Sequence, residues 1–213
     1  MGYTGIEPLY SRVELGPQFD DLYNEVQQRV NPESINDVKR VNEALIKEAL
    51  NRMKGGKSDA LYDFSSDMLI NGPPELITHL TNMIRSFLVH GFIPHFLLLC
   101  TLIPLVKDSL SDISSSENYR RIAISSLICK LIDWVILLLE ESKLSMDQLQ
   151  FGYQQMSSTT MSTWAVNAVI EHFNNKGAVV YGCAADLSKA FDVISWVPLF
   201  KELIERGICS VFL

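Results

Sequence analysis

The chain has 213 residues, of which 47% are hydrophobic and 20% are charged, so it is long enough to bury the core of one domain and a piece of a second, and its composition excludes a disordered protein. The formal net charge of −7 and the pI of about 5.1 exclude a protein that holds nucleic acid over its whole surface. Any nucleic-acid contact must come from a few local cations.

The cysteines and the apolar segments place limits on compartment and partners. No CxxC pair occurs, which leaves a zinc site and a disulfide framework unsupported. Three of the four cysteines lie in apolar runs, as is typical of reduced core cysteines in an intracellular protein with no disulfide partner. Residues 1–30 are mixed polar and do not resemble a secretory signal, and no basic run decides between nucleus and cytoplasm. The four cysteines are Cys100, Cys129, Cys183 and Cys209.

The first third of the chain predicts a lead-in followed by a helix. Residues 1–32 have weak periodicity and are interpreted as a lead-in or linker, with a short helix near 19–29. Ser34 and Asp37 match an S-x-x-D capping box at the start of a helix that ends near residues 55–56.

A second helix and an apolar strand follow. Pro74 suits the first turn of a helix that Gly91 closes. The apolar run 96–106 is shorter than the roughly 20 residues of a membrane-spanning helix, so we interpret it as a buried strand or a pair of short strands and expect no membrane partner. A polar loop, residues 108–118, comes next.

The second half predicts two long helices, a strand and a terminal helix. Residues 126–141 are apolar nearly all round, which predicts a heavily buried helix. Residues 178–185 are small and β-branched and predict a buried strand that ends at Asp186, followed by a helix over residues 196–206. This alternation predicts a mixed α/β domain, rich in helices and with a few buried strands. The remaining helix, over residues 158–173, is expected to face inward through Trp164, Val166, Val169, Ile170 and Phe173.

Asp186 is the residue from which chemistry is expected. A carboxylate at the end of a buried strand is held rigidly and offers the oxygens that a hard divalent cation such as Mg²⁺ binds. Asp is also a favoured helix N-cap, and from position alone the capping role is the more common one. Both interpretations are open on the residues themselves.

Four sequence blocks, in order along the chain, resemble the reverse transcriptases of non-LTR (LINE-type) retrotransposons. Asp186 begins a D-x-x-K-A-F-D block like the first palm motif of that family. The other blocks resemble the family's K-x-x-K-x-x-G-x-D, I-P-x-x-K with N-Y-R-P-I, and Q-F-G-F with S-T elements. They begin at Lys54, Ile103 with Asn118, and Gln150 with Ser158, respectively.

The resemblance implies the fingers and the start of the palm of a right-hand polymerase, with fingers over residues 33–148 and the first part of the palm over residues 149–213. It implies an RNA-directed DNA polymerase whose partners are an RNA template, a DNA primer and a deoxynucleoside triphosphate. Its cofactor would be a pair of Mg²⁺ ions that clamp the attacking and leaving oxygens.

By the same resemblance, Asp186 would be the first metal ligand and Leu187 would offer its backbone carbonyl. Phe191 would lie under the sugar and disfavour a 2′-hydroxyl, whereas its alternative role is core packing. Lys107 and Arg120 would bind the triphosphate, and the commoner fate of such cations is simple solvation.

The remaining implied contacts are weaker. Gln150 would help form the nucleotide site. Template contacts would come from Lys54, Lys57, Gly152, Ser158 and Thr159; Ser158 could instead be a helix N-cap, and the two lysines ordinary solvated cations.

The chain departs from the family pattern at several positions. Arg121 stands where the family usually has Pro and Met156 where it usually has Gly, and Gln154 and Gln155 replace basic residues. The Y-x-D-D hairpin, which supplies the other catalytic carboxylates of the family, does not occur in these 213 residues. We therefore expect a fragment that is inactive alone, and the alternative is a decayed, non-enzymatic remnant or an interaction module.

Overall fold

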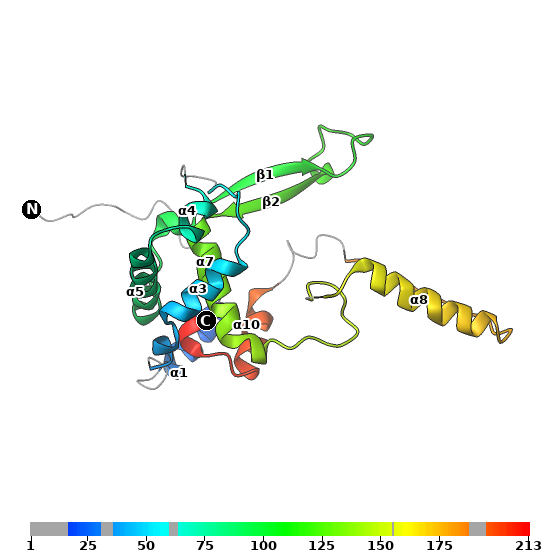
Figure 1. Ribbon diagram of the computed structural model, residues 1–213. Coiled ribbons are helices and arrows are strands. Elements are labelled where there is room, and N and C mark those ends of the chain that lie inside the picture. The colour runs from blue at the N-terminus through cyan, green and yellow to red at the C-terminus, as the bar shows by residue number, and fades with distance from the viewer. Residues whose placement is uncertain (1–16, 31–35, 60–63, 155, 188–194) are drawn as a thin grey trace, which may run out of the picture.

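The computed structural model describes residues 17–30, 36–59, 64–154, 156–187 and 195–213. It is rich in helices and contains a two-stranded antiparallel sheet, which confirms the mixed α/β class. Figure 1 shows a helical body from which a β-hairpin and one long helix project. The helices are α1 (Pro17–Arg29), α3 (Glu43–Arg52), α4 (Ser66–Ile70), α5 (Pro74–His90), α6 (His95–Leu98), α7 (Leu127–Glu140), α8 (Thr159–Asn174) and α10 (Trp196–Glu205), and the strands are β1 (Cys100–Val106) and β2 (Tyr119–Ser125). Single 3₁₀ turns are η1 (Val38–Arg40), η2 (Ser116–Asn118), η3 (Glu141–Lys143) and η4 (Ser210–Phe212).

Local capping chemistry sets several of the helix ends. Ser126 caps α7 by accepting a hydrogen bond from Cys129 N, and Gly91 closes α5 in the left-handed conformation at φ 58°. The expected capping box is wrong as the start of α3: Asp37 makes no side-chain cap bond, and Ser34 lies outside the described residues. Asn42 caps α3 instead, by accepting from Leu45 N at 2.9 Å, because the chain turns once through η1 and is extended at Val41 before the helix begins.

The core lies where α3, α5 and α7 pack together. Each helix contributes an apolar stripe at helical spacing, and Ile46, Ile84 and Leu131 are completely buried at its centre. Burying a side chain of this size contributes roughly 1.5–3 kcal/mol. The buried cluster comprises Val41, Ile46, Ala49, Leu50, Met53, Leu69, Leu80, Ile84, Leu127, Leu131, Ile132 and Val135.

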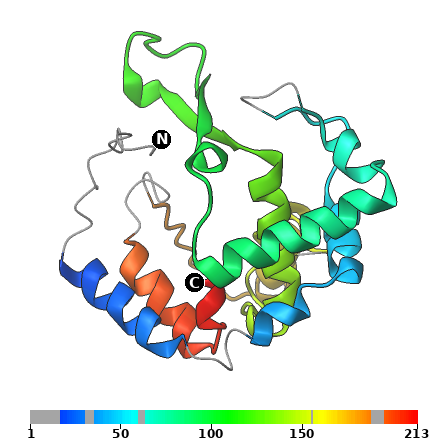
Figure 2. The ribbon, with the colours of Figure 1, turned by 90° about the vertical axis from the view of Figure 1, so that its left-hand side faces the viewer.

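The two ends of the described chain pack against each other. Figure 2 shows α1 beside α10, with η4 next to them, and both α1 and α5 contact η4. Leu22, Ile208 and Phe212 are buried there. The division into a lead-in, fingers and palm stays a prediction, although residues from all three expected parts meet in this body.

The strand predicted over residues 96–106 forms as β1, but it is not buried. β1 pairs antiparallel with β2, from Cys100 opposite Ser125 to Val106 opposite Tyr119. Six of the seven β1 residues are exposed, because the hairpin projects from the body and no other described helix or strand covers either of its faces (Figure 1).

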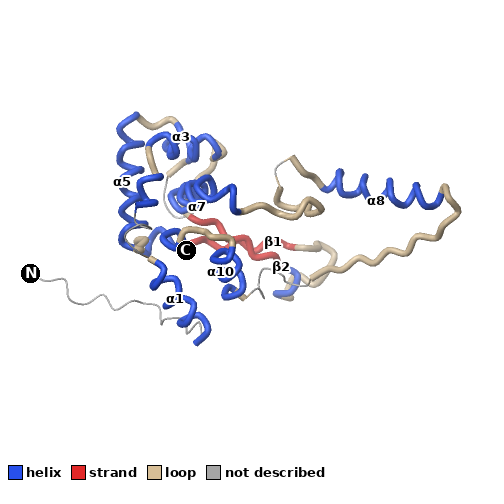
Figure 3. The backbone as a smooth tube through the Cα atoms, turned by 90° about the horizontal axis from the view of Figure 1, so that it is seen from below, coloured by secondary structure: helices blue, strands red, loops and turns tan. Residues whose placement is uncertain are grey.

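The predicted packing of α8 and of the segment after it is wrong. α8 begins and ends one residue later than predicted, but Trp164 is 73% exposed and none of the helix's residues is buried. Residues 178–187 form no strand and are all exposed. Figure 3 shows this segment returning from the far end of α8 toward α10 as an extended loop. A strand forms only where a partner takes its backbone hydrogen bonds, and the described chain places none beside it.

A buried carboxylate joins α7 to the turn that precedes α3. Glu140 is fully buried at the end of α7, and its Oε1 accepts a hydrogen bond from Arg40 Nη1 at 3.1 Å. Its Oε2 is paired with the ammonium of Lys143, which also donates to the carbonyl of Gly207 at 2.7 Å. A buried charge must be paired in this way, because its desolvation is otherwise costly.

All four cysteines are free. The expected core position is wrong for Cys100 and Cys183, which are exposed, because β1 and residues 178–187 are not covered. No helix in the described residues has the length and apolarity needed to span a membrane.

We predict that Glu140→Gln lowers the free energy of unfolding by about 1.5–3 kcal/mol, the range for hydrogen bonds to charged groups, because two cations lose their counter-charge. Urea denaturation followed by circular dichroism measures the change. The matched control is Glu141→Gln at the exposed neighbouring position, which should change stability by no more than about 0.5 kcal/mol. Equal effects of the two substitutions would contradict a structural role for the buried carboxylate.

Candidate functional site

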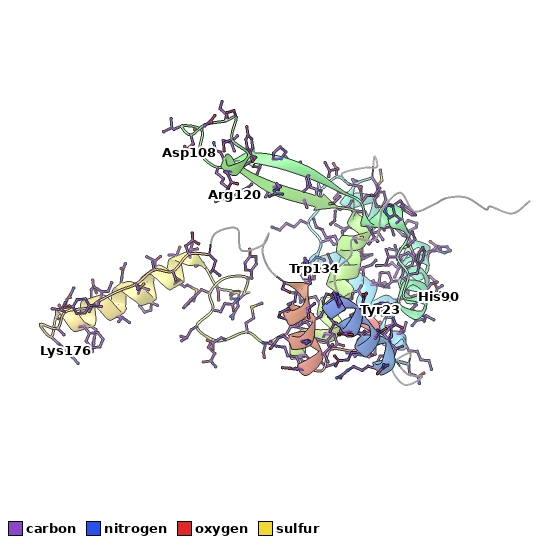
Figure 4. All side chains as sticks on the ribbon, turned by 180° about the vertical axis from the view of Figure 1, so that it is seen from behind. Tyr23, His90, Asp108, Arg120, Trp134 and Lys176 are labelled. Atoms are coloured by element: carbon purple, nitrogen blue, oxygen red, sulfur yellow. The ribbon has the colours of Figure 1, made fainter. Side chains whose placement is uncertain are left out.

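The hairpin brings together two of the expected triphosphate ligands. Leu105 and Arg120 are directly opposite each other in the ladder, so their side chains share one face. Lys107 directly follows the last residue of β1, and its N–H donates to Asn118 O at 2.7 Å, which keeps it beside the start of β2. Arg121 falls on the opposite face, opposite Pro104. Figure 4 shows Arg120 and Asp108 near the tip, far from the helical body.

The loop that joins the two strands is organised by Asn118. Its amide nitrogen donates to Asp108 O at 2.7 Å, while its side-chain oxygen accepts from Asp108 N at 3.1 Å. Lys107 Nζ donates to the carbonyl of Glu117 at 2.8 Å, which holds the ammonium at the base of the loop. Asn118 is buried although the loop around it is exposed, so the loop has a defined shape rather than a random one.

Two carboxylates of the loop are held by donors from their own turns. Asp108 accepts from Ser111 Oγ and Leu110 N, and these hydrogen bonds lower the pKa of its carboxyl below the ordinary value of 3.8. Asp112 accepts from both the hydroxyl and the backbone N of Ser114, which lowers its pKa in the same way. The tip therefore carries carboxylates as well as cations. Lys107 and Arg120 could attract an anion only at close range, because the loop as a whole has no net positive field.

Asp186 and Leu187 lie in the exposed segment that returns from α8, not on the hairpin. Both side chains are open to solvent, with Leu187 80% exposed. Phe191 and the helical turn that Asp186 was expected to cap lie outside the described residues. Within the described ranges no three His, Cys, Asp or Glu side chains gather as a metal site would require. A single carboxylate provides too few ligands to hold two metal ions. The two-ion magnesium site therefore stays a prediction.

The Gln150–Thr159 element forms the turn that leads into α8. Gln150 is exposed and its Nε2 donates to the carbonyl of Gly152 at 3.2 Å. Ser158 Oγ accepts from Met161 N at 3.3 Å, which confirms its alternative role as the N-cap of α8. Thr159 is the first residue of that helix. Template contact by these residues stays a prediction.

Met156 has a left-handed backbone conformation, with φ 61°. This is the position at which the resembled family usually has Gly. The left-handed region costs a residue with a Cβ roughly 1–2 kcal/mol but is open to Gly, so this backbone suits Gly better than Met. Tyr153, in the same turn, also has a positive φ of 59°.

Lys54 and Lys57 lie at a cleft of about 560 Å³ at the root of the hairpin. Both are exposed, and they come from the loop between α3 and α4. The start of α7 forms another wall of this cleft, through Leu127, Lys130 and Trp134. Figure 4 places Trp134 on the body, away from the hairpin tip.

Comparison with known proteins gives no match: no protein-family model and no curated protein matches this chain.

The sequence did not indicate a role for three residues at the hairpin tip and in the cleft at its root. Asn118 was noted only as part of a block, and its burial could not be seen without the loop fold. Lys130 and Trp134 are four residues apart, a spacing that places both on one side of a helix, but nothing in the sequence indicates that α3 ends beside them.

We predict that the hairpin loop loosens on acidification, with a midpoint below pH 3.8. A carboxyl whose pKa is lower in the folded state stabilises that state above its unfolded pKa, and the contribution is lost as the pH falls through the folded pKa. Asp108 and Asp112 both have pKa values shifted in this direction. The amide NMR signals of Leu110 and Ser114, which donate to these carboxylates, report the transition.

The control is Asp108→Asn, which keeps an acceptor for Leu110 N but does not titrate, and should remove the pH dependence of that amide alone. A midpoint at or above 3.8 for the Leu110 amide would contradict the stabilising role of the carboxylate.

Proposed function

We propose that this chain is part of an RNA-directed DNA polymerase of the non-LTR retrotransposon type, in which the β1–β2 hairpin binds the triphosphate of the incoming nucleotide. One observation carries the proposal. The two blocks that resemble the family's fingers, separated in sequence, form the two sides of one hairpin, with Arg120 in β2 and Lys107 directly after β1 near its tip.

The chemistry of the two side chains suits a triphosphate. The planar guanidinium of Arg120 can donate two parallel hydrogen bonds to phosphate oxygens, and the Lys107 ammonium acts as a point charge. Lys107 uses one of its three donors on the Glu117 carbonyl, which leaves two for a ligand. The exposed hairpin gives a bulky anion access from solvent.

The left-handed Met156 gives independent support for the resemblance, since it lies where the family usually has Gly. In the proposed polymerase, Mg²⁺ would neutralise charge on the nucleotide and activate the primer hydroxyl. Asp186 would be one of its ligands. Because one carboxylate does not anchor two ions, we propose that these residues alone do not polymerise, and that the intact polymerase supplies the other carboxylates.

A second candidate is a non-enzymatic interaction module. The exposed apolar surface of α8 favours it, because Trp164, Val166 and Val169 are each more than half exposed. Large exposed apolar surfaces are typical of protein–protein contacts.

We predict that Arg120→Ala and Lys107→Ala each weaken binding of a deoxynucleoside triphosphate roughly tenfold or more, the effect of losing a hydrogen bond to a charged group. Isothermal titration calorimetry with Mg²⁺ present measures the affinity. Arg121→Ala is the matched control, since it removes the same side chain from the opposite face and should change the affinity less than about twofold. Equal losses for Arg120 and Arg121, or no binding by the unaltered chain, would reject the hairpin as a triphosphate site.

We also predict that the 213-residue chain gives no magnesium-dependent extension of a DNA primer on an RNA template. Asp186→Asn serves as the control for any residual signal, because a signal that persists in it comes from a contaminant. Extension by the unaltered chain that Asp186→Asn abolishes would show that the residues described here suffice for catalysis.

A further inference from the structure

The projecting hairpin presents the outer edge of β2 to solvent (Figure 1). In the described part of the chain β1 and β2 form a two-stranded sheet, so no described strand lies along either outer edge. Opposed residues of an antiparallel ladder alternate between pairs that exchange hydrogen bonds and pairs whose N–H and C=O groups point outward. Lys107 N–H donates to Asn118 O at 2.7 Å, one step beyond the opposed pair of Val106 and Tyr119, so Tyr119 is an outward position. Alternation along β2 gives the outward set Tyr119, Arg121, Ala123 and Ser125.

The edge of β2 is uninterrupted, whereas the edge of β1 is blocked. The same alternation makes Pro104 an outward position of β1, opposite Arg121. Proline has no N–H to donate, and proline on an edge strand is one of the devices that prevent a further strand from pairing. All four outward positions of β2 carry an N–H. A two-stranded ribbon is marginally stable by itself, so an added strand on the β2 side would stabilise it.

β2 can pair with β2 of a second copy of the chain without bringing like charges directly opposite each other. A two-fold axis through Ile122 pairs all seven residues of the strand and places the two copies of Ile122 face to face. Arg121 then faces Ala123 of the second copy, and Arg120 faces Ile124. An axis through Arg121 would instead oppose two arginines, which is destabilising. The sequence of β2 is therefore self-complementary in one register.

That register brings the tip of each hairpin to the root of the other. Tyr119, at the tip end of β2, would face Ser125 of the second copy, and Ser125 lines the cleft at the hairpin root. The cleft lies on the β2 side of the ribbon, because Ile124 and Ser125 are among its lining residues and no residue of β1 is. The loop over residues 108–118, which precedes Tyr119, therefore continues toward the cleft of the second copy.

The charges of the loop and the cleft are opposite. The loop contains three carboxylates and no lysine or arginine. Hydrogen bonds lower the pKa of both Asp108 and Asp112, so these two are ionised at neutral pH. No acidic residue is among those that line the cleft, and its like charges repel one another unless an anion offsets them. The cations along its walls are Arg52, Lys54, Lys57 and Lys130.

We propose that two copies of this chain associate through the outer edges of β2, antiparallel about Ile122, so that the two hairpins form one four-stranded sheet and the acidic loop of each lies at the basic cleft of the other. The same surface is used by both copies, so the contact closes as a dimer and does not extend into a filament. Opposite charges at both ends set the orientation. The interface is small, which predicts a reversible dimer of roughly micromolar affinity. The proposal rests on the strand edges and their charges, and is independent of the proposed polymerase function.

Sedimentation velocity with the full chain, from about 1 to 100 μM, brackets that affinity. The decisive variant is Ala123→Pro, which removes an outward N–H from β2 and leaves the ladder with β1 intact. We expect it to raise the dimer dissociation constant about tenfold or more, because two symmetry-related hydrogen bonds are lost. The matched control is Leu102→Pro at the directly opposed position, whose N–H points outward from the other edge, and it should change the constant less than about twofold. Circular dichroism checks that both variants fold.

A charge exchange tests the contact between loop and cleft. Lys54→Glu with Lys57→Glu makes the cleft acidic, and Asp112→Lys with Glu117→Lys makes the loop basic. Each double variant alone should dimerise about tenfold more weakly, since like charges then meet at both ends. An equimolar mixture of the two should regain the affinity of the unaltered chain to within about fivefold, because both of its ends again pair opposite charges.

Disulfide cross-linking tests the register without a proline substitution. In a background with Cys100→Ser and Cys183→Ser, which removes the two exposed native thiols, Ile122→Cys should form a covalent dimer on mild oxidation. Its two copies would be a non-hydrogen-bonded pair with Cα atoms about 4.5 Å apart, within disulfide range. Arg121→Cys is the control, because its two copies would be diagonal neighbours at roughly 7–8 Å.

Four results would overturn the proposal. The unaltered chain could sediment as a monomer throughout the concentration range, or the two proline variants could dimerise equally well. The mixed charge variants could bind no more tightly than each alone, which would exclude the contact between loop and cleft. Cross-linking of Arg121→Cys as readily as Ile122→Cys would exclude the register about Ile122.

Discussion

The contact between α3 and α7 is the constraint on which the other features depend. α7 begins directly after β2, with Ser126 as its cap, so its position fixes where the hairpin leaves the body. The end of α3 lies against the start of α7, and the cleft is the space between the side chains that these two ends project. At its other end α7 carries Glu140, which pairs with Arg40 just before α3. The apolar packing between these two helices thus positions both candidate sites, and the ion pair of Glu140 with Arg40 joins the far end of α7 to the turn before α3.

Charge in this protein is organised locally. The net charge of −7 would repel a polyanion at long range, yet screening limits such repulsion to about 8–10 Å at physiological salt. Within that distance, the cleft presents four cations and the hairpin tip presents Lys107 and Arg120. The expectation that any nucleic-acid contact must come from a few local cations is therefore compatible with the observed grouping. Binding of an anionic ligand would then depend strongly on salt and be slow, because the net charge of the whole molecule does not steer the ligand toward either site.

The sequence was informative where short-range chemistry decides the structure. Ser126, Ser158 and Gly91 determine helix ends through groups within one turn. Gly91 was predicted to close its helix and Ser158 was an alternative N-cap, while for Ser126 only the start of the helix was predicted. The first hairpin strand and the polar loop that follows it were also predicted from composition, whereas β2 was not. Burial was predicted correctly for α7 but not for β1 or residues 178–185, because burial depends on what packs from elsewhere: the apolar residues of β1 are exposed, and residues 178–185 form no strand. Trp134 and Asn118 acquire their roles only when α3 and the loop fold against them, so neither carries a signal of its own.

α8 is the clearest case of a helix whose apolar residues predict a packing partner that the described residues do not provide. Isolated helices shorter than about 12–15 residues are marginal in water, and even longer helices in proteins gain most of their stability by packing an apolar face. α8 is 16 residues long and exposes Trp164, Val169 and Phe173, while the β-branched run after it remains unpaired. The proposed polymerase gives one physical reason for this. Carboxylates that share two ions about 3.5–4 Å apart must come together, so a Y-x-D-D hairpin in the intact enzyme would have to lie beside the segment that ends at Asp186. Such a hairpin would supply that segment with backbone partners, and it would bring apolar side chains near the exposed surface of α8.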